Sequence, residues 1–275
     1  MLNILILSVI KNSNRSRPIS MLSKEECKQA INKWEKSRHN FEDVKKLIDP
    51  SAVFKFTEDN CKWIKENNDN EIFHCYVGVH NNILILIIMP LYKDGKEKIH
   101  LNQYITTPLT NLTEEITLIQ IDVVTTVSKA RLSRNLEIIK KSKDVYFPTF
   151  NEPDITLKES LKDIEKWKNE CLDWFGYMTS KKSKRKKIFR VFSVPTADLE
   201  REDKKDGEIV ALFGFKKSSI YKTQLPILIF VTTERETSDR VIIASSNNQE
   251  LSSTNTKDWS YPVPPYHNKD NFNFL

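Results

Sequence analysis

The sequence predicts an α+β fold made of two related units, each with helices followed by an antiparallel β-meander. Residues 83–107 hold two apolar runs joined by a polar connection, and a shift of 126 positions places them without a gap on residues 209–233. Each unit also opens with a Ser/Thr-x-x-Glu capping box before a helix that carries a tryptophan. We expect the two sheets to be packed by helices and by each other.

The composition divides the chain into an extension and two units. Residues 1–20 are predicted to be an unpacked N-terminal extension, because their apolar run 1–10 has no basic stretch ahead of it and no small-residue cleavage site behind it. The first unit is expected over 21–147 and the second over 148–275, which ends in a strap rich in proline and aromatic residues. No apolar run reaches the ~20 residues that span a bilayer, so we expect a soluble, cytoplasmic protein without a membrane partner.

The first unit is predicted to contain helices and a three-stranded meander. Ser23 and Glu26 form a capping box, and the apolar positions that follow keep helical spacing as far as Trp34. The dipeptides at 81–82 (Asn-Asn) and 94–95 (Asp-Gly) are turn signals between apolar runs. After the first helix, the expected elements are helix 41–48, β-segment 52–56, helix 58–66 and strands 72–79, 83–91 and 99–107.

Residues 113–141 are the ambiguous stretch of the chain. Their apolar positions keep a helical spacing, whereas the β-branched run 123–127 favours a strand. We predict a long helix over this stretch, preceded by a short strand. The two prolines that follow predict a linker over 142–153.

The second unit repeats the order of the first. A second capping box at 156–159 and Trp167 match those of the first unit, and residues 188–192 match strand residues 72–76 at a different offset. Elements that recur in the same order at different offsets predict tandem duplication with insertions and deletions in the loops, and chance similarity of short apolar strands is the alternative. The remaining expected elements are a strand over 238–246 and an irregular surface strap over 254–275.

The opening Ser/Thr-x-x-Glu helix that ends in tryptophan, the strand 72–79 (IFHCYVGV) and the closing segment 259–266 (WSYPVPPY) are similar to those of uncharacterised α+β proteins common in Bacteroidetes. The resemblance implies the same fold class for both units, and it carries over no function. Proteins of that group tend to end in a proline segment that contains cysteines. Val263 and Tyr266 stand at the comparable places here, which leaves a thiol role unsupported.

Several catalytic and cofactor classes lack their sequence signatures in this chain. It has only five glycines and neither G-x-G-x-x-G nor G-x-x-x-x-G-K, which excludes a Rossmann or P-loop nucleotide site. The four cysteines show no C-x-x-C spacing, so reduced thiols are expected and no zinc knuckle or disulfide framework. No G-x-S-x-G or H-E-x-x-H motif occurs. We therefore expect no cofactor and no metal, and the sequence favours a non-catalytic protein.

A polar strand face is the candidate for metal binding or catalysis. His74, Tyr76 and His80 alternate along one predicted strand, so their side chains point to the same face. His100 and Tyr104 lie on a neighbouring strand. Converging imidazoles can bind a metal or act as general bases. No carboxylate is spaced to complete the set, and exposed hairpin histidines without a function are the alternative interpretation.

Two basic stretches are the candidates for contact with phosphates. One lies within 180–187 and carries six positive charges, which equals the net charge of +6 of the whole chain, and the other lies within 129–143. Phosphate contacts would give salt-dependent affinity for nucleic acid. A solvated connection is the alternative, because no aromatic residue suited to base stacking lies among these charges. The candidate residues are Lys181, Lys182, Lys184, Arg185, Lys186 and Lys187 in the first stretch and Lys129, Arg131, Arg134, Lys140, Lys141 and Lys143 in the second.

These features predict a soluble, non-catalytic binding or assembly module. The alternatives are a nucleic-acid-binding protein that uses the two basic stretches and an enzyme of unrecognised type that uses the His74 face. The run 83–89 (ILILIIM) has neither alternation nor charge, so the strand that contains it should be covered on both faces. We expect the two units to share one extensive interface, and we expect residual apolar surface to support a homodimer.

Overall fold

The structure is a computed structural model that describes most of the chain. The described residues are 20–113, 115–118, 120–121, 125–135, 137–146, 155–199, 208–218, 223–233, 253–254, 256–258, 260–264 and 272. The predicted extension lies outside them apart from Ser20, and so do the expected strand 238–246 and much of the C-terminal strap. Within the part of the chain that is described, no helix is long and apolar enough to cross a membrane.

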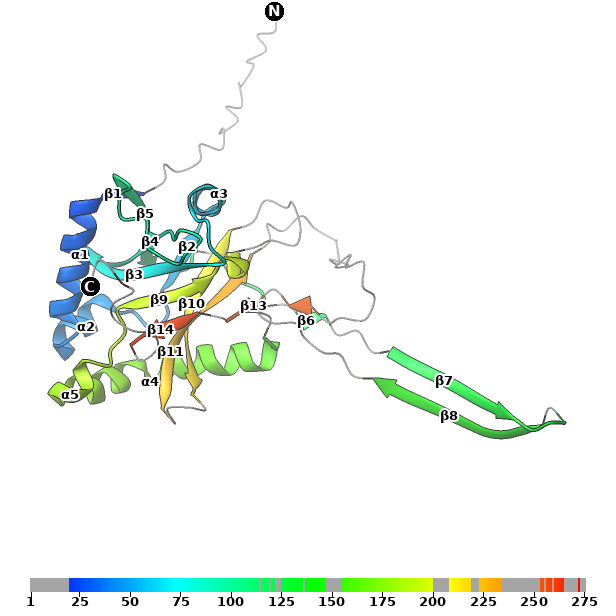
Figure 1. The fold of residues 1–275 in the computed structure, drawn as a ribbon. Helices are drawn as coiled ribbons and strands as arrows, with labels where there is room; N and C mark the ends of the chain where they lie inside the picture. Colours follow the sequence, from blue (N-terminus) through cyan, green and yellow to red (C-terminus); the bar gives the residue numbers. More distant parts are fainter. Residues whose placement is uncertain are drawn as a thin grey trace, which may run out of the picture.

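The fold is α+β and is built around one large antiparallel sheet (Figure 1). Its ten strands are β1 (Met21–Ser23), β2 (Val53–Phe56), β3 (Ile72–His80), β4 (Ile83–Met89), β5 (Gln103–Thr110), β9 (Val191–Pro195), β10 (Ile209–Lys217), β11 (Gln224–Thr232), β13 (Thr256–Lys257) and β14 (Tyr261–Val263). They follow the order β13-β11-β10-β2-β5-β4-β3-β9-β14, with β1 paired to β5. Two small ribbons lie outside this sheet and pair β6 (Gln120–Ile121) with β12 (Ser253–Thr254) and β7 (Thr125–Leu132) with β8 (Ile138–Tyr146).

Two helices begin at the capping residues that the sequence predicts. Ser23 and Glu26 form the expected reciprocal capping box, and the Thr156 side chain accepts from the Glu159 backbone N–H. Asn40 and Thr57 cap the two shorter helices in the same way. The helices are α1 (Lys24–Ser37), α2 (Phe41–Leu47), α3 (Glu58–Asn67), α4 (Leu157–Thr179) and α5 (Lys182–Arg185), with a 3₁₀ turn over Thr196–Leu199.

Strands from both predicted units are hydrogen-bonded within this one sheet. The expected strands 83–91, 99–107, 209–215 and 225–232 correspond to β4, β5, β10 and β11, although β5 begins only at Gln103. β2 of the first unit pairs with β10 of the second, and β9 of the second pairs with β3 of the first. The predicted stacking of two separate sheets is therefore replaced by edge-to-edge pairing. The predicted duplication is not confirmed.

The C-terminal segment closes the sheet, and this corrects the prediction of an irregular strap. β13 pairs with β11 at one end of the strand order, and β14 pairs with β9 at the other. Between them, the Ser260 hydroxyl accepts from the Leu228 backbone N–H at 2.7 Å and donates to its carbonyl at 2.9 Å. Strand pairing occurs despite the prolines, because edge strands do not need every backbone donor.

The core explains the unbroken apolar run of β4. Alternate residues of the run enter two different hydrophobic clusters, with Leu84, Leu86 and Ile88 on one face of the sheet and Ile85, Ile87 and Met89 on the other. The first cluster contains Trp34 and Trp167, each with 1% of its surface exposed, which confirms their predicted burial. The chain itself thus covers both faces of β4, and this run gives no support to a homodimer.

The predicted helix over 113–141 is wrong for the residues that are described. This stretch contains β6, β7 and the first part of β8, and the expected linker 142–153 begins inside β8. The β-branched residues from Thr125 to Val127 lose side-chain freedom in a helix and favour the extended backbone found here. The helical spacing of the apolar positions did not decide the structure, because the ribbon has no sheet or helix to pack against.

Candidate nucleic-acid interface

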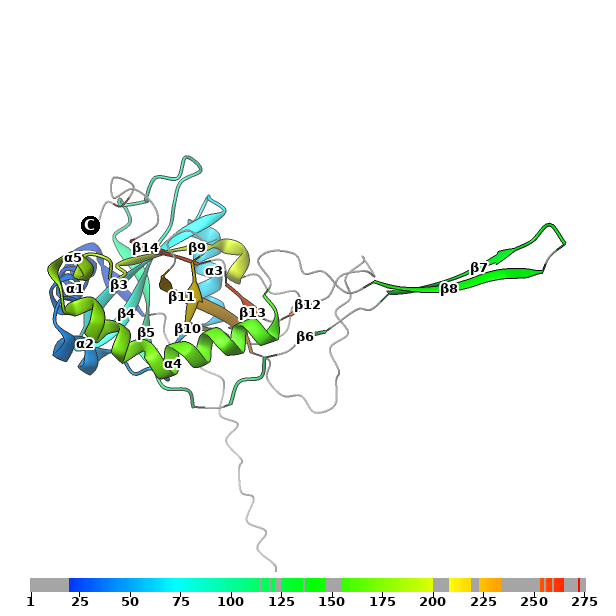
Figure 2. The same cartoon turned by 90° about the horizontal axis from the view of Figure 1, so that it is seen from below.

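The β7–β8 ribbon projects away from the rest of the molecule (Figures 1 and 2). The nine residues of β8 make the ribbon about 30 Å long at ~3.3 Å per residue. Its described side chains are exposed or half-exposed along both strands. Such a two-stranded ribbon has no core of its own and is at best marginally stable in isolation.

The ribbon is strongly basic. It carries all six basic residues of the predicted stretch 129–143, against the acidic residues Glu137 and Asp144. Within the described part of this ribbon, Lys129 Nζ forms an ion pair with Asp144 Oδ2 at 2.8 Å, and both side chains are largely exposed. The structure therefore brings the second basic stretch together in space, as a single protruding surface.

The strand register distributes these charges over both faces of the ribbon. Arg131 stands directly opposite Lys140, and Lys129 precedes Arg131 by two residues on the same face. Like charges in directly opposed positions destabilise a strand pair. Described acidic side chains form no ion pair with Arg131 or Lys140. An anionic partner would remove this repulsion.

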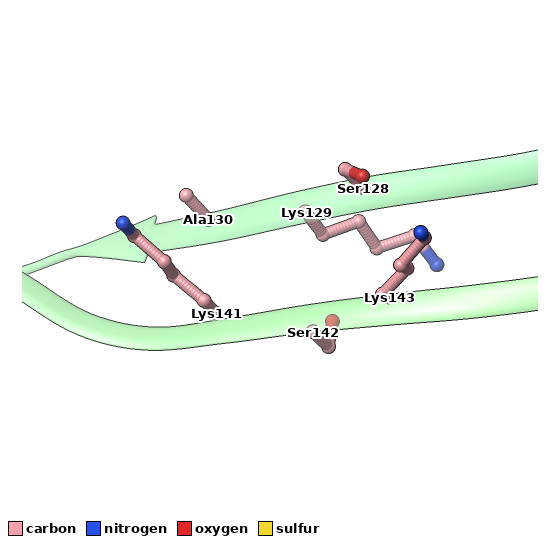
Figure 3. A pocket seen from close by; sticks show the side chains of 6 residues that line it. All are labelled: Ser128, Lys129, Ala130, Lys141, Ser142 and Lys143. Atoms are coloured by element: carbon pink, nitrogen blue, oxygen red, sulfur yellow. The ribbon is translucent and has the colours of Figure 1, made fainter.

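The other face carries two further lysines beside small side chains. Lys141 pairs with Ala130 and Lys143 pairs with Ser128, so short and long side chains alternate across the strands. These residues, together with Lys129 and Ser142 from the opposite face, line a shallow, open hollow on the ribbon (Figure 3).

The first basic stretch lies at α5, at the end of α4 remote from the ribbon (Figure 2). Arg185 is held in place, because its Nε donates to the Thr179 carbonyl at 2.6 Å and its own carbonyl accepts from Arg38. Lys184 lies over the ring of Tyr177, 3.2 Å from its centroid, and this tyrosine is 63% exposed. In the folded protein, an exposed aromatic ring from outside the stretch therefore lies beside these charges, which the sequence did not predict. The exposed residues of the stretch are Lys181, Lys182, Lys186 and Lys187.

The predicted polar face is only partly brought together. His74 Nδ1 lies 2.8 Å from Glu97 Oε1, and the Tyr76 hydroxyl donates to the same oxygen at 2.5 Å. Glu97 is the carboxylate that the sequence did not reveal, because it lies in the turn before β5 and far along the chain from His74. His80 stands at the end of β3, and His100 is exposed and contacts the Tyr92 hydroxyl at 2.8 Å.

The His74–Glu97–Tyr76 cluster is buried, which gives it the character of a structural network. His74 is 4% exposed, Glu97 is 3% exposed, and the Phe272 ring covers the imidazole at 4.7 Å between ring centroids. The described residues include no group of three His, Cys, Asp or Glu side chains suited to a metal. A buried polar network of this kind fixes the position of the chain segments that it joins.

Three of the four thiols are unsuited to nucleophilic chemistry at neutral pH. Burial raises the pKa of Cys27 and of Cys171 to about 12 each, and it raises the pKa of Cys75 well above the ordinary value. A thiol is nucleophilic only as the thiolate. These three cysteines therefore act as small apolar core residues.

A second cluster of charges lies between α4 and the C-terminal segment. Lys216 Nζ contacts Asp258 Oδ2 at 2.8 Å, and the Asp258 side chain is 3% exposed. Burial raises the pKa of Asp163 on α4 to about 6, the Lys166 charge opposes this shift, and the Asp258 charge adds to it. Asp163 is thus a described carboxyl that changes its protonation close to neutral pH.

Comparisons with protein-family models, with curated proteins and with solved structures find no match to this chain. The resemblance to the Bacteroidetes group stays an expectation. The function is therefore inferred from the geometry of the described residues.

Proposed function

We propose that this protein is a non-catalytic binding module whose β7–β8 ribbon contacts a nucleic-acid duplex. The observation that supports this is the ribbon itself, a projecting two-stranded element with six basic and two acidic residues and no body to pack against. An anionic partner would neutralise the opposed Arg131 and Lys140 and would order a ribbon that is marginal alone.

The dimensions of the ribbon suit a duplex groove. A two-stranded β-ribbon fits the major groove of B-form DNA, which is ~12 Å wide. The length of about 30 Å corresponds to roughly nine base pairs at 3.4 Å per pair. Basic side chains on both faces can reach phosphates on the two sides of a groove, and such contacts fix the register of the protein on the duplex.

Binding assays with labelled double-stranded DNA, double-stranded RNA and single-stranded DNA at two salt concentrations will test this proposal. The informative variant changes Arg131, Lys140, Lys141 and Lys143 to Ser. If all four residues contact phosphates, the affinity at low salt will fall at least about tenfold, and the slope of log K against log salt will decrease by up to about 3.6.

A charge-matched control separates the ribbon from net charge. It changes four exposed lysines of the body to Ser, and this variant is expected to bind almost as well as the wild type, because these residues lie away from the ribbon. The control residues are Lys28, Lys45, Lys46 and Lys65. Equal losses in the two variants, or no binding by the wild-type protein, would contradict the proposal.

A third variant examines the α5 stretch. Changing Lys184, Arg185, Lys186 and Lys187 to Ser should weaken binding only if the duplex reaches the far end of α4. We expect an effect on affinity smaller than that of the ribbon variant, because the two surfaces are separated by most of the length of that helix (Figure 2).

A further inference from the structure

The tip of the ribbon exposes two consecutive isoleucines. Ile138 is 58% exposed and Ile139 is 54% exposed, and these are the most exposed large aliphatic side chains among the described residues. They follow Glu137 at the turn and precede the paired basic residues of the ribbon. Apolar side chains left in water at the end of a projecting element indicate a surface that a partner covers.

The backbone at the tip is irregular in a way that repositions these side chains. Arg131 pairs with Lys140, but Leu132 pairs with Ile138, so Ile139 is an extra residue on β8. A bulge of this kind bends the strand, increases its twist and redirects side chains. The tip therefore differs from the regular ribbon both in its geometry and in its apolar character.

We propose that the partner is double-stranded DNA and that the Ile138–Ile139 tip enters between base pairs and bends the duplex. This inference rests on the proposed function and adds a mode of binding to it. Proteins that bend DNA from the minor groove insert apolar wedges between base steps. The ribbon would place a wedge of the same kind from the wider major groove, while its basic side chains hold the adjacent phosphates. The ribbon offers both parts, the wedge at its end and the cations along its length.

The distribution of charge favours a duplex over a lipid surface. A membrane would meet the tip alone, and the basic residues on the strands behind it would stay in water. The lysines at 129, 141 and 143 stand back along the ribbon from the tip, where only an elongated partner can reach them together with the isoleucines. Charge along the whole ribbon is thus matched by a polyanion that runs beside it.

The same geometry favours DNA over duplex RNA. The major groove of A-form RNA is deep and narrow, and side chains do not enter it. The ribbon is two strands wide and needs an open groove before its tip can reach a base step. We therefore expect strong bending only with B-form DNA.

The test measures bending and affinity separately. A duplex of about 20 base pairs, ~68 Å long at 3.4 Å per pair, carries a donor and an acceptor dye at its two ends. Such a duplex is nearly straight when free, because the persistence length of DNA is ~150 base pairs. Wild-type protein should increase the energy transfer, as expected for a bend of about 20–90°.

The decisive variant is the double substitution Ile138→Ser and Ile139→Ser. It should return energy transfer to the level of the free duplex, while the affinity falls less than about tenfold and the salt slope stays unchanged, because the phosphate contacts remain. Val145→Ser is the matched control, since Val145 is 47% exposed on the same strand but lies near the base of the ribbon. The control should bend DNA like the wild type.

The outcomes distinguish this inference from the proposed function. Wild-type binding without bending, or bending that survives the double substitution, overturns the wedge and leaves the proposed function standing. If the wild-type protein binds none of the duplexes, both the wedge and the proposed function are overturned. Binding to vesicles of 7:3 phosphatidylcholine and phosphatidylserine that the double substitution abolishes, together with unbent DNA, would overturn the wedge in favour of a membrane contact.

Discussion

The ten-stranded sheet and the β7–β8 ribbon are both antiparallel β-structure, yet they are stabilised in opposite ways. Residues of β4 are buried on both faces, whereas the described side chains of β7 and β8 meet water on both faces. In the sheet, side-chain packing on both faces stabilises the strands. In the ribbon, only cross-strand hydrogen bonds and local backbone preference do so. The comparison teaches that stability resides in the sheet and that the ribbon contributes little to it, which is why we propose a role in binding for the ribbon.

The largest effect on stability should come from the core of the sheet. Trp167 stacks on Phe213 at 4.5 Å between ring centroids and also contacts Phe215. Trp167→Ala removes these contacts and should lower the free energy of unfolding by about 3–5 kcal/mol, measured by urea denaturation. Tyr177→Ala on the same helix is the exposed control and should cost less than about 1 kcal/mol. Equal losses would contradict the description of the core.

A smaller loss is expected from the buried polar cluster. Glu97→Ala removes the acceptor that His74 and Tyr76 share and should destabilise the protein by about 1–3 kcal/mol. Glu97→Gln keeps an oxygen at that place and should recover part of this loss. Thermal unfolding of both variants beside the wild type measures the difference. An unchanged melting temperature in Glu97→Ala would show that the cluster contributes nothing to the fold.

Asp163 should make stability depend on pH. Its pKa of about 6 in the folded protein lies above the ordinary 3.8, so the folded state binds this proton more tightly than the unfolded state does. Stability from this group is therefore present below about pH 4 and is lost as the pH rises to about 6. Asp163→Asn should be more stable than the wild type by about 2 kcal/mol at pH 7 and close to it at pH 4. A constant difference across this range would contradict the shift.

The smallest effect on stability should follow from removing the ribbon itself. Thr125 and Tyr146 are paired across its base, so a short Gly-Ser linker can replace the residues between them. The free energy of unfolding should change by less than about 0.5 kcal/mol, because little of the ribbon is buried. Duplex binding by the same protein should be lost. A large loss of stability would mean that the ribbon is part of the folded body after all.

The sequence predicted the parts of the fold that depend on local signals. The capping boxes at Ser23 and Thr156 start helices, and the Asn81-Asn82 turn joins β3 and β4 with positive φ angles of 50° and 60°. The ILILIIM run also predicted burial on both faces. These signals work because the residues that decide each structure are close together in the chain.

The features that were missed depend on distant contacts or on their absence. Glu97 reaches His74 only through the turn before β5, and β14 joins the sheet only because β9 offers it an open edge. The sequence predicted a helix in place of the ribbon because apolar residues at helical spacing normally form a helix face that packs against other elements. The described residues provide no such element beside the ribbon. For the candidate site, the sequence singled out the basic residues of 129–143, but it did not predict their common position on a projecting ribbon.

The closing strand pairs have a consequence for the order in which the molecule is synthesised. Residues 256–263 supply the partners of both β9 and β11, so these two edges stay open on the ribosome until that late segment emerges. Open edges recruit other strands, and pairings between residues far apart in sequence form slowly. A messenger truncated shortly before these codons would release a chain that keeps every other strand of the sheet but has two unprotected edges. Such a chain would be prone to aggregate and would be a natural substrate for chaperones and proteases.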